Sequence, residues 1–308
     1  MFSLIGVPKV DFIGMRKYAF ILSTLLVILG LAAFLMIGLG KADMGIDFAG
    51  GVLIKGHFDQ PASIESLRSA LTAEYSDITV TELQDFSLPN AYIIKSKRPD
   101  NEATGNERVA SIERIIAQHF AGNTFTKISE HVIGPAVGAS LRNAAWKAIL
   151  LSLIGILVYI WFRFDVRSGV AAAIATFHDV LAVAGILWIL GFEFDLLVVS
   201  ALLTLAGYSL TDTVVVYDRI RENLRKFRSK ADFVPSINRS INETLSRTIN
   251  TSMTVLMVVV ILFFFGGEVL RTFSFALILG VLVGTYSSIF VASPIIVEWE
   301  ARSPKRFK

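Results

Sequence analysis

Six stretches of the chain are apolar for long enough to cross a lipid bilayer. A helix rises about 1.5 Å per residue, so roughly 20 apolar residues span a hydrocarbon core of about 30 Å. The six stretches are Tyr18–Leu39, Ala144–Phe162, Gly169–Phe192, Leu196–Val216, Ile249–Phe265 and Val269–Val297. The first is too long for the apolar core of a signal peptide and lacks a convincing cleavage site, which favours a retained signal anchor. The pattern predicts a membrane protein with a six-transmembrane α-helical bundle.

Residues 41–141, between the first two apolar stretches, show the shorter periodicities of a small globular domain. Alternating apolar positions predict strands, and apolar positions three to four residues apart predict helices. Strands are expected within Asp47–Phe58 and at Ile78–Leu83, Ala91–Lys97 and Thr124–Val132, and helices at Pro61–Tyr75 and Asn106–Phe120. This βαββαβ order is that of the ferredoxin-like split motif. We therefore expect a ferredoxin-like α+β domain inserted between spans 1 and 2.

The basic residues of the short loops indicate which side of the membrane each segment occupies. Lysine and arginine are enriched on the cytoplasmic side, and a cytoplasmic N-terminus places Arg163, Arg167, the basic loop Arg219–Arg247 and Arg302 on that side. The predicted segments are a cytoplasmic N-terminus 1–17, span 1 at 18–40, an extracytoplasmic (periplasmic) domain 41–141, spans 2–6 within 142–298 with a cytoplasmic loop 217–247, and a cytoplasmic tail 299–308.

The cytoplasmic loop is long enough to hold an amphipathic helix. Phe233, Ile237 and Ile241 would form the apolar side of this helix. We expect that side to lie on the membrane surface or on a partner.

The composition agrees with a membrane protein rather than a soluble domain. Of the 308 residues, 54% are hydrophobic and 18% are charged, and the mean hydropathy is +0.61. The sequence has no cysteine, which excludes a disulfide framework, a thiolate metal site and a thiol nucleophile. The net charge of +3 comes from clusters that flank the apolar stretches, so it bears on topology and indicates no nucleic-acid partner.

The fourth apolar stretch carries a row of polar residues. Ser200, Thr204, Tyr208 and Asp212 are four residues apart, so they share one face of a helix. A carboxylate inside a spanning helix costs roughly 2.5–3.5 kcal/mol on insertion scales. That cost favours a role for Asp212 in energy coupling, in which the polar row orders a chain of water molecules along the helix. The alternative is structural, with Asp212 near water at the cytoplasmic end and the hydroxyl groups in interhelical hydrogen bonds.

A second polar row opens the fifth apolar stretch. Arg247, Asn250, Thr251 and Thr254 share a helix face. One interpretation pairs Arg247 with Asp212 at comparable depth. Burial favours a protonated carboxyl group and a guanidinium favours an ionised one, so a carboxylate between these effects can take up and release a proton. The alternative is an arginine that extends toward the cytoplasmic interface.

Two adjacent ionisable residues, His178 and Asp179, lie near the middle of the third apolar stretch. Neighbouring helical residues point about 100° apart, so both need a polar interior. They are candidates for a proton relay or a polar tie to the fourth span, and equally for a buried pair that determines helix packing. They are weak metal ligands because no second histidine or carboxylate follows four residues later. We expect no metal and no other cofactor.

Three residues beside or within the last spans are candidates for structural or interface contacts. Arg219 follows the fourth apolar stretch and is expected mainly as a solvated anchor at the interface. Gly280 and Gly284 lie on one face of the last span. Such small residues allow helices to approach closely, so they predict helix packing or the docking of a second subunit.

Asp47 lies between the first span and the first strand, in a segment with two adjacent glycines. Gly50 and Gly51 indicate a tight turn or a close approach of two backbones. The segment is not a phosphate-binding loop, because lysine and serine or threonine are missing at the required offset.

Several of these segments together resemble SecF, the smaller membrane subunit of the bacterial SecD–SecF protein-export factor, a family related to resistance-nodulation-division exporters. They run in order along nearly the whole chain: Gly45–Gly51 (GIDFAGG), Phe177–Asp179 (FHD), Gly207–Asp212 (GYSLTD), Asp218–Asn223 (DRIREN) and Ser246–Ser252 (SRTINTS). The single set of six spans and the short outer domain favour SecF over SecD or a fused chain. Thr211 stands where family chains carry asparagine, which keeps the carboxylate that follows.

The resemblance implies a subunit of the Sec machinery that uses the proton gradient to promote late preprotein translocation. It implies the bacterial inner membrane, both termini cytoplasmic, membrane lipid around the spans, a SecD-like partner, the SecYEG channel, a YajC-like subunit and an unfolded preprotein. The family's proton-pathway residues carry over to Asp212 and Arg247. The polar row of the fourth apolar stretch and the ionisable pair of the third add further candidates for the proton pathway: Tyr208, Thr204, Asp179 and His178.

Two alternatives remain beside this non-enzymatic role. The first is a half-subunit of a proton-driven exporter of small molecules or lipids, which predicts a sizeable apolar cavity. The second is an intramembrane aspartyl protease that uses Asp179 and Asp212, because two carboxylates sharing a proton suit that chemistry. No Gly-x-Gly-Asp motif occurs in the sequence.

Overall fold

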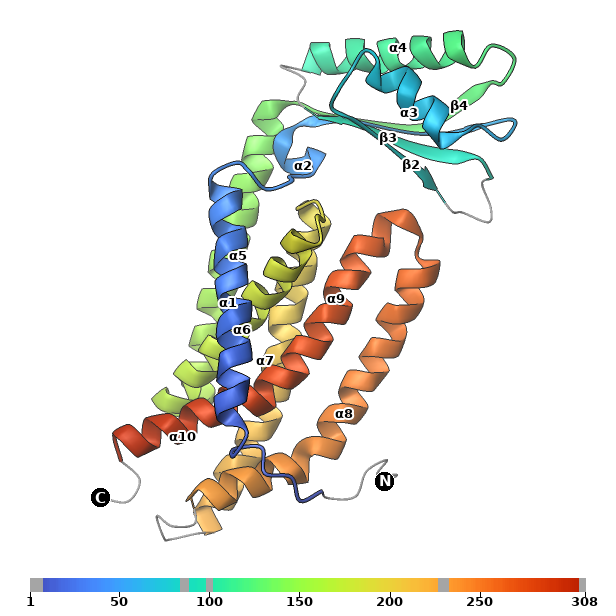
Figure 1. The fold of residues 1–308 in the computed structure, drawn as a ribbon. Helices are drawn as coiled ribbons and strands as arrows, with labels where there is room; N and C mark the ends of the chain where they lie inside the picture. Colours follow the sequence, from blue (N-terminus) through green and yellow to red (C-terminus); the bar gives the residue numbers. More distant parts are fainter. Residues whose placement is uncertain (1–7, 84–88, 98–101, 227–232, 305–308) are drawn as a thin grey trace.

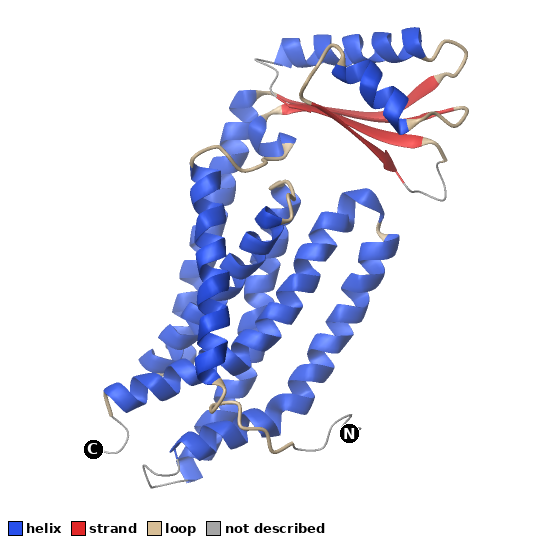
Figure 2. Cartoon of the chain, in the orientation of Figure 1, coloured by secondary structure: helices blue, strands red, loops and turns tan. Residues whose placement is uncertain are grey.

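Six long helices form the membrane part of the protein (Figures 1 and 2). The computed structural model describes residues 8–83, 89–97, 102–226 and 233–304. The helices are α1 (Arg16–Gly38), α5 (Pro135–Arg163), α6 (Val166–Ile189), α7 (Leu196–Lys226), α8 (Phe233–Phe265) and α9 (Gly267–Ser287). All six spans are long and apolar enough to cross a membrane, and the sixth runs on to Arg302. The six-span prediction is confirmed.

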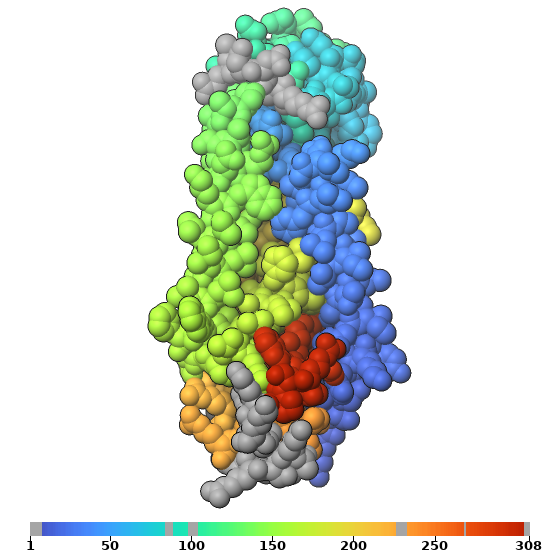
Figure 3. All heavy atoms as spheres, turned by 90° about the vertical axis from the view of Figure 1, so that its left-hand side faces the viewer, coloured from blue at the N-terminus to red at the C-terminus, as the bar shows by residue number. Residues whose placement is uncertain are grey.

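Helix α6 is the most buried of these spans. In its most apolar window 72% of the residues are buried, against 17% in α1 and 11% in α5. Gly30 of α1 meets Gly185 of α6 so closely that a Cβ atom at Gly185 would lie 2.6 Å from the Gly30 nitrogen. Backbones approach this closely only where side chains are absent. Figure 3 shows α1 (blue) and α5 (green) along one face of the molecule, with α10 (Ser293–Arg302, red) in the lower half, beside the blue segment.

The last span bends near the end of the bundle remote from the α+β domain, here called the inner end. A π-helical turn, η2 (Ser288–Ala292), joins α9 to α10. Pro294 follows in the first turn of α10 and has no N–H to donate to the preceding turn. Ser293 Oγ donates instead to the carbonyl of Ser288 (2.9 Å). Figure 1 shows α10 leaving the axis of α9 at this point.

The described residues between the fourth and fifth apolar stretches continue the helices α7 and α8. Phe233, Ile237 and Ile241 lie in the first turns of α8, and all three are buried in one cluster with Phe12 and Tyr217. The expectation that this apolar side lies on the membrane surface or on a partner is wrong. The N-terminal segment of the chain and α7 cover it.

An α+β domain lies outside the bundle, at its outer end. Its elements are α2 (Ile46–Ala49), β1 (Gly51–Phe58), α3 (Ile64–Thr72), β2 (Ile78–Leu83), β3 (Ala91–Lys97), α4 (Glu102–His119) and β4 (Phe125–Ile133). The strands form one antiparallel sheet in the order β2-β3-β1-β4. Helices α3 and α4 cover one face of it (Figure 2). This is the predicted ferredoxin-like arrangement.

The core of this domain follows the predicted alternation, with small differences at the element ends. Val52 and Ile54 of β1 pack with Leu67 of α3 and Ile112 of α4, all fully buried. Helix α3 begins later than predicted because Ser63 caps it, its Oγ accepting from the Ser66 amide (3.4 Å). The first strand is shorter than its predicted segment, because residues 46–49 form the helical turn α2.

Candidate functional site

Asp212 lies on α7 inside the bundle, between α8 and α9, and is 4% exposed. Ser252 Oγ of α8 donates a hydrogen bond to Asp212 Oδ2 (3.3 Å) and lies 2.7 Å from Thr285 Oγ1 of α9. Tyr208 lies one turn away on α7 and donates its hydroxyl proton to Ser252 Oγ (3.2 Å). Hydroxyl groups from three helices therefore form a connected polar network that ends on a buried carboxylate.

Ser252 and Thr285 are the members of this network that sequence analysis did not identify. Ser252 follows the polar row of α8 but points about 100° away from its neighbour Thr251. Thr285 is an isolated hydroxyl residue whose Oγ1 also donates to the Val281 carbonyl, one turn back in α9 (2.8 Å). Neither position has a periodic signal. Ser252 ends the segment Ser246–Ser252 that carries the family resemblance, but only the packing of the three helices shows that it meets Asp212 and Thr285.

Arg247 is exposed on α8, and it does not form the direct contact with Asp212 that the polar rows suggested. Among the described residues, no ion pair within 4 Å joins the two side chains. Arg247 shares its helix face with Thr251 and Thr254, which are also exposed. Thr251 approaches Asp212 from this face and Ser252 donates to it from the adjacent one, so the predicted polar row reaches the carboxylate through Thr251 and not through Arg247. The guanidinium is still near enough to act on the carboxylate through its charge.

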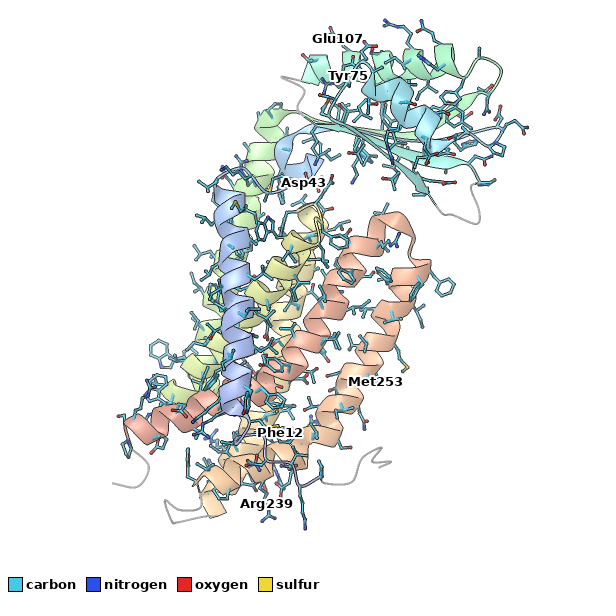
Figure 4. All side chains as sticks on the ribbon, in the orientation of Figure 1. Phe12, Asp43, Tyr75, Glu107, Arg239 and Met253 are labelled. Atoms are coloured by element: carbon cyan, nitrogen blue, oxygen red, sulfur yellow. The ribbon has the colours of Figure 1, made fainter. Side chains whose placement is uncertain are left out.

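The outer half of the polar row on α7 faces away from the other helices. Ser200 and Thr204 are exposed, and their hydroxyl groups donate to carbonyls of their own helix, at Leu196 (2.8 Å) and Ser200 (2.8 Å). Gly207 and Thr211 are exposed on the same side. Together with the exposed residues Arg247, Thr251 and Thr254 of α8, they form an open polar surface at membrane depth. Figure 4 shows Met253 on the side of α8 turned away from α9.

His178 and Asp179 form a second buried cluster, which meets α7 at Ser209, three residues before Asp212. Asp179 is fully buried, and His178 Nδ1 lies 2.8 Å from its Oδ1. Its Oδ2 accepts from Ser287 of α9 (2.7 Å) and from Ser209 of α7. The two residues are thus tied to two other helices. No group of three or more His, Cys, Asp or Glu among the described residues could hold a metal ion.

Arg219 and the two glycines of the last span lie in contacts between helices. Arg219 pairs with Glu243 of α8 (2.7 Å) and with Glu222 of its own helix (2.6 Å). It therefore ties α7 to α8 at the inner end. A Cβ at Gly280 would lie 2.9 Å from Leu205 Cβ, and one at Gly284 would lie 3.1 Å from Ser209 Cβ. These two glycines let α9 pack closely on α7.

Asp47 lies in α2, where the outer domain meets the membrane helices. Its Oδ2 accepts a hydrogen bond from the Leu196 amide, the first residue of α7 (3.1 Å). Gly50 has φ +77°, and a Cβ at Gly51 would lie 2.6 Å from the Ser96 carbonyl oxygen. The two glycines therefore allow the chain to turn into β1 beside β3.

Three comparisons place this geometry in a known family. The pattern of the protein-export membrane protein SecD/SecF family, C-terminal part, matches residues 113–302. The protein translocase subunit SecF of Thermodesulfovibrio yellowstonii is 45% identical over 96% of this chain and 97% of its own length. The SecF subunits of Desulfurispirillum indicum and Pseudomonas aeruginosa are 42% and 37% identical, each over 95% of this chain and 92% of their own length.

Solved structures agree. The crystal structure of SecDF from Thermus thermophilus, a translocon-associated membrane protein, matches 97% of this chain with a TM-score of 0.81 and 36% identity. SecDF in a super-membrane-facing form matches 98% with a TM-score of 0.69 and 35% identity. This chain spans 40% of either SecDF chain. The chain is a multi-pass membrane protein that belongs to the SecF subunits of the SecD/SecF protein-export family.

Proposed function

We propose that this SecF-family chain uses the proton gradient, together with a SecD-like partner, to promote late translocation of preproteins across the bacterial inner membrane. Asp212 would bind and release the proton. Tyr208, Ser252 and Thr285 would hold its carboxyl group and the water that reaches it. Arg247 would act on the carboxylate through its charge, and Thr204 would extend the polar path outward.

The observation that carries this proposal is the buried carboxylate of Asp212, which the hydroxyl groups of Ser252 and Thr251 approach and which forms no ion pair within 4 Å among the described residues. A carboxylate without an ion-pair partner at membrane depth is costly to keep ionised. Its protonation therefore changes how strongly α7 and α8 attract each other. One elementary charge that crosses 100 mV releases about 2.3 kcal/mol, which is enough to shift the populations of two conformations.

The open polar surface of α7 and α8 supports a second membrane subunit. Ser200, Thr204, Thr251 and Thr254 are exposed at membrane depth, where a helix surface facing lipid is normally apolar. The SecDF chains matched above are more than twice as long as this one, which supports a SecD-like partner for the remainder. SecYEG, a YajC-like subunit and an unfolded preprotein are the further partners that we propose, with both termini cytoplasmic.

His178 and Asp179 would support the polar interior next to this path. Their cluster contacts α7 at Ser209, directly beside Tyr208 of the Asp212 network. A change in the position of α7 therefore affects both clusters. In the part of the chain that the structure describes, no hydrogen bond joins the carboxylates of Asp179 and Asp212, which hold separate sets of hydroxyl groups. This separation does not support an aspartyl protease.

The exporter alternative requires a cavity for its cargo. The apolar cavity between α1, α5 and α7, lined by Phe34, Trp146 and Leu202 among others, has a volume of about 40 Å³. Pockets for small organic ligands hold roughly 300–1,000 Å³. A cleft of about 480 Å³ lies within the outer domain, beside Phe120 and Phe125, and not between spans. Neither space favours an exporter.

The test replaces the carboxyl group by its neutral analogue. Asp212→Asn should assemble with the SecD-like partner but lose the proton-gradient-dependent stimulation of preprotein export into inverted membrane vesicles. Asp218→Asn is the matched control, because Asp218 lies on the same helix and is about two-fifths exposed in a surface pair with Arg163. Full stimulation by the Asp212→Asn complex would contradict the proposal.

A further inference from the structure

The outer domain is joined to the membrane helices by more than the two chain segments that enter and leave it. The turn between α6 and α7 reaches up to the segment before α2. The Phe194 amide donates to the Asp43 carbonyl (2.8 Å), and the Gly45 amide donates to the Phe194 carbonyl (2.8 Å). Met44 and Phe194 are thereby bridge partners in a short parallel pairing. Figure 4 shows Asp43 at this junction.

Ion pairs join the end of β3 to the same turn. Glu193 pairs with Lys95 (3.1 Å) and with Lys97 (3.1 Å), and Lys97 also pairs with Asp43. Burial by itself raises the pKa of the Glu193 carboxyl group, but the two ammonium groups outweigh burial and hold that pKa below its usual value. The net attraction therefore favours the closed contact at neutral pH.

Two carboxylates cap the outer end of α7, and they come from different parts of the fold. Asp195 Oδ1 accepts from the Val198 amide of its own helix (2.7 Å). Asp47 Oδ2 reaches across from the outer domain to the Leu196 amide (3.1 Å). Burial, and secondarily the charge of Asp47, raise the pKa of Asp195. A carboxylate at a helix N-terminus satisfies an unpaired N–H and interacts favourably with the helix dipole.

These contacts form what we call the outer joint, made of residues 43–47, Lys95, Lys97 and 193–196. Helix α7 runs from this joint to Asp212, a distance of about 24 Å at 1.5 Å per residue. A helix of this length is stiff, so its two ends move together. The same rod thus connects the proposed proton site with the outer domain.

We propose that the outer joint makes the outer domain and α7 one rigid body, and that Asp47 is the positioning residue that transmits a displacement of α7 to the outer domain. This inference rests on the proposed function of Asp212. In a working cycle the joint stays closed, and the whole body tilts on the rest of the bundle. The outer domain of this chain is then moved by its membrane helix and does not swing freely on its two connections.

A disulfide across the joint tests whether it stays closed. The sequence contains no cysteine, so Met44→Cys with Phe194→Cys introduces a single pair, and bridge partners lie within the Cα separation that a disulfide spans. In the complex with the SecD-like partner, the oxidised variant should stimulate export as well as the same sample after reduction. If oxidation abolishes export stimulation and reduction restores it, the proposal is overturned. If Phe194→Cys prevents folding, Asp43→Cys with Lys97→Cys, linked by a short bis-thiol reagent, asks the same question.

Substitutions at Asp47 test the transmission. Asp47→Ala should lower export stimulation several-fold. Asp47→Asn should retain most of the stimulation, because the amide oxygen still accepts from the Leu196 amide. Adding the oxidised Met44→Cys/Phe194→Cys pair to Asp47→Ala should restore the stimulation. Asp195→Ala is the matched control, since it removes a cap of the same helix while the tie to the outer domain remains. Equal losses in Asp47→Ala and Asp195→Ala, or no rescue by the disulfide, would overturn the role of Asp47.

A local measurement separates this inference from the proposed function. Amide hydrogen exchange at Leu196 should be about tenfold faster in Asp47→Ala, the size expected for a lost cap, and unchanged in Asp212→Asn. Unchanged exchange at Leu196 in Asp47→Ala would refute the joint even if Asp212 carries the proton. Conversely, an active Asp212→Asn complex with fast exchange in Asp47→Ala would refute the proton site and leave the joint in place.

Discussion

The crossing of α1 and α6 offers a sharp test of the packing. A Cβ at Gly30 would lie 2.3 Å from the Leu181 carbonyl oxygen, and one at Gly185 would lie 2.6 Å from the Gly30 nitrogen. Carbon atoms in contact normally stay about 3.5 Å from their neighbours. Gly185→Ala therefore forces the two helices apart by about 1 Å, because backbone atoms cannot move aside as a flexible side chain can.

The cost of this separation follows from what it breaks. Overpacking in a well-packed core costs about 1–3 kcal/mol. Helix α1 is also held by Tyr286 of α9, which donates to the Ala19 carbonyl (2.8 Å) and lies 3.0 Å from Ser23 Oγ. A shift of 1 Å removes at least one of these hydrogen bonds, worth about 1 kcal/mol. We expect Gly185→Ala to lower the free energy of unfolding by about 2–4 kcal/mol.

Unfolding in mixed micelles, followed by circular dichroism as denaturing detergent is added, measures this loss. Gly155→Ala is the control, because a Cβ at Gly155 of α5 meets nothing within 4 Å; it should change stability by less than about 0.5 kcal/mol or raise it slightly, since alanine favours helix. The double variant Gly30→Ala/Gly185→Ala should lose less unfolding free energy than the sum of the two single variants, because both substitutions separate the same pair of helices. A Gly185→Ala protein as stable as the wild type would refute this account of the crossing.

Three further predictions follow from charges and hydrogen bonds at the two ends of the bundle. Glu300→Ala leaves Arg167 without its ionic partner at a site where the two side chains are 5% and 11% exposed, so thermal unfolding should show a loss of about 3–5 kcal/mol. Asn242→Ala removes two hydrogen bonds to the Val10 backbone (2.9 and 2.8 Å), so limited proteolysis should cut before α1 about tenfold faster. The ion pairs of Glu193 contribute their full stability above pH 4.5, the ordinary pKa of a glutamate, and this contribution is lost as the pH falls through the lower pKa of Glu193 in the folded protein. Glu193→Gln should therefore make the free energy of unfolding depend less on pH below about pH 4.5.

The outer domain shows where periodicity is sufficient. Strands β2 and β3 begin and end where the alternation of apolar residues predicts, at Ile78–Leu83 and Ala91–Lys97. In β2, Ile78 and Val80 are buried while Thr79 between them is exposed, so a shift of one residue would expose them. Strand β3 is buried on both faces, with Tyr92 and Ile94 on one and Ala91 and Ile93 on the other. The helical turn α2 was missed because four residues hold no period. A Cβ at Gly138 of α5 would lie 3.1 Å from the Phe48 carbonyl oxygen, so packing against α5 accompanies this turn.

The candidate site shows where periodicity stops being sufficient. The four-residue spacing correctly placed Thr204, Tyr208 and Asp212 along one side of α7. Yet the outer part of that side is open while Asp212 is buried against α8 and α9. The neighbouring helices cover only part of α7, and the angles at which they cross α7 cannot be predicted from the sequence of α7 alone. The expected contact between Arg247 and Asp212 failed for the same reason, since the rotation of α8 presents Ser252.

The sequence by itself determined the number of spans, the βαββαβ order of the outer domain and the family, because hydrophobic periods and motif order are local properties of the chain. Only the tertiary structure decided which polar groups meet: Ser252 and Thr285 around Asp212, Ser209 and Ser287 around Asp179, and Asp47 on the first turn of α7. Each of these contacts joins residues from different helices. Their geometry depends on how the helices rotate and cross, which is the outcome of packing all of them at once.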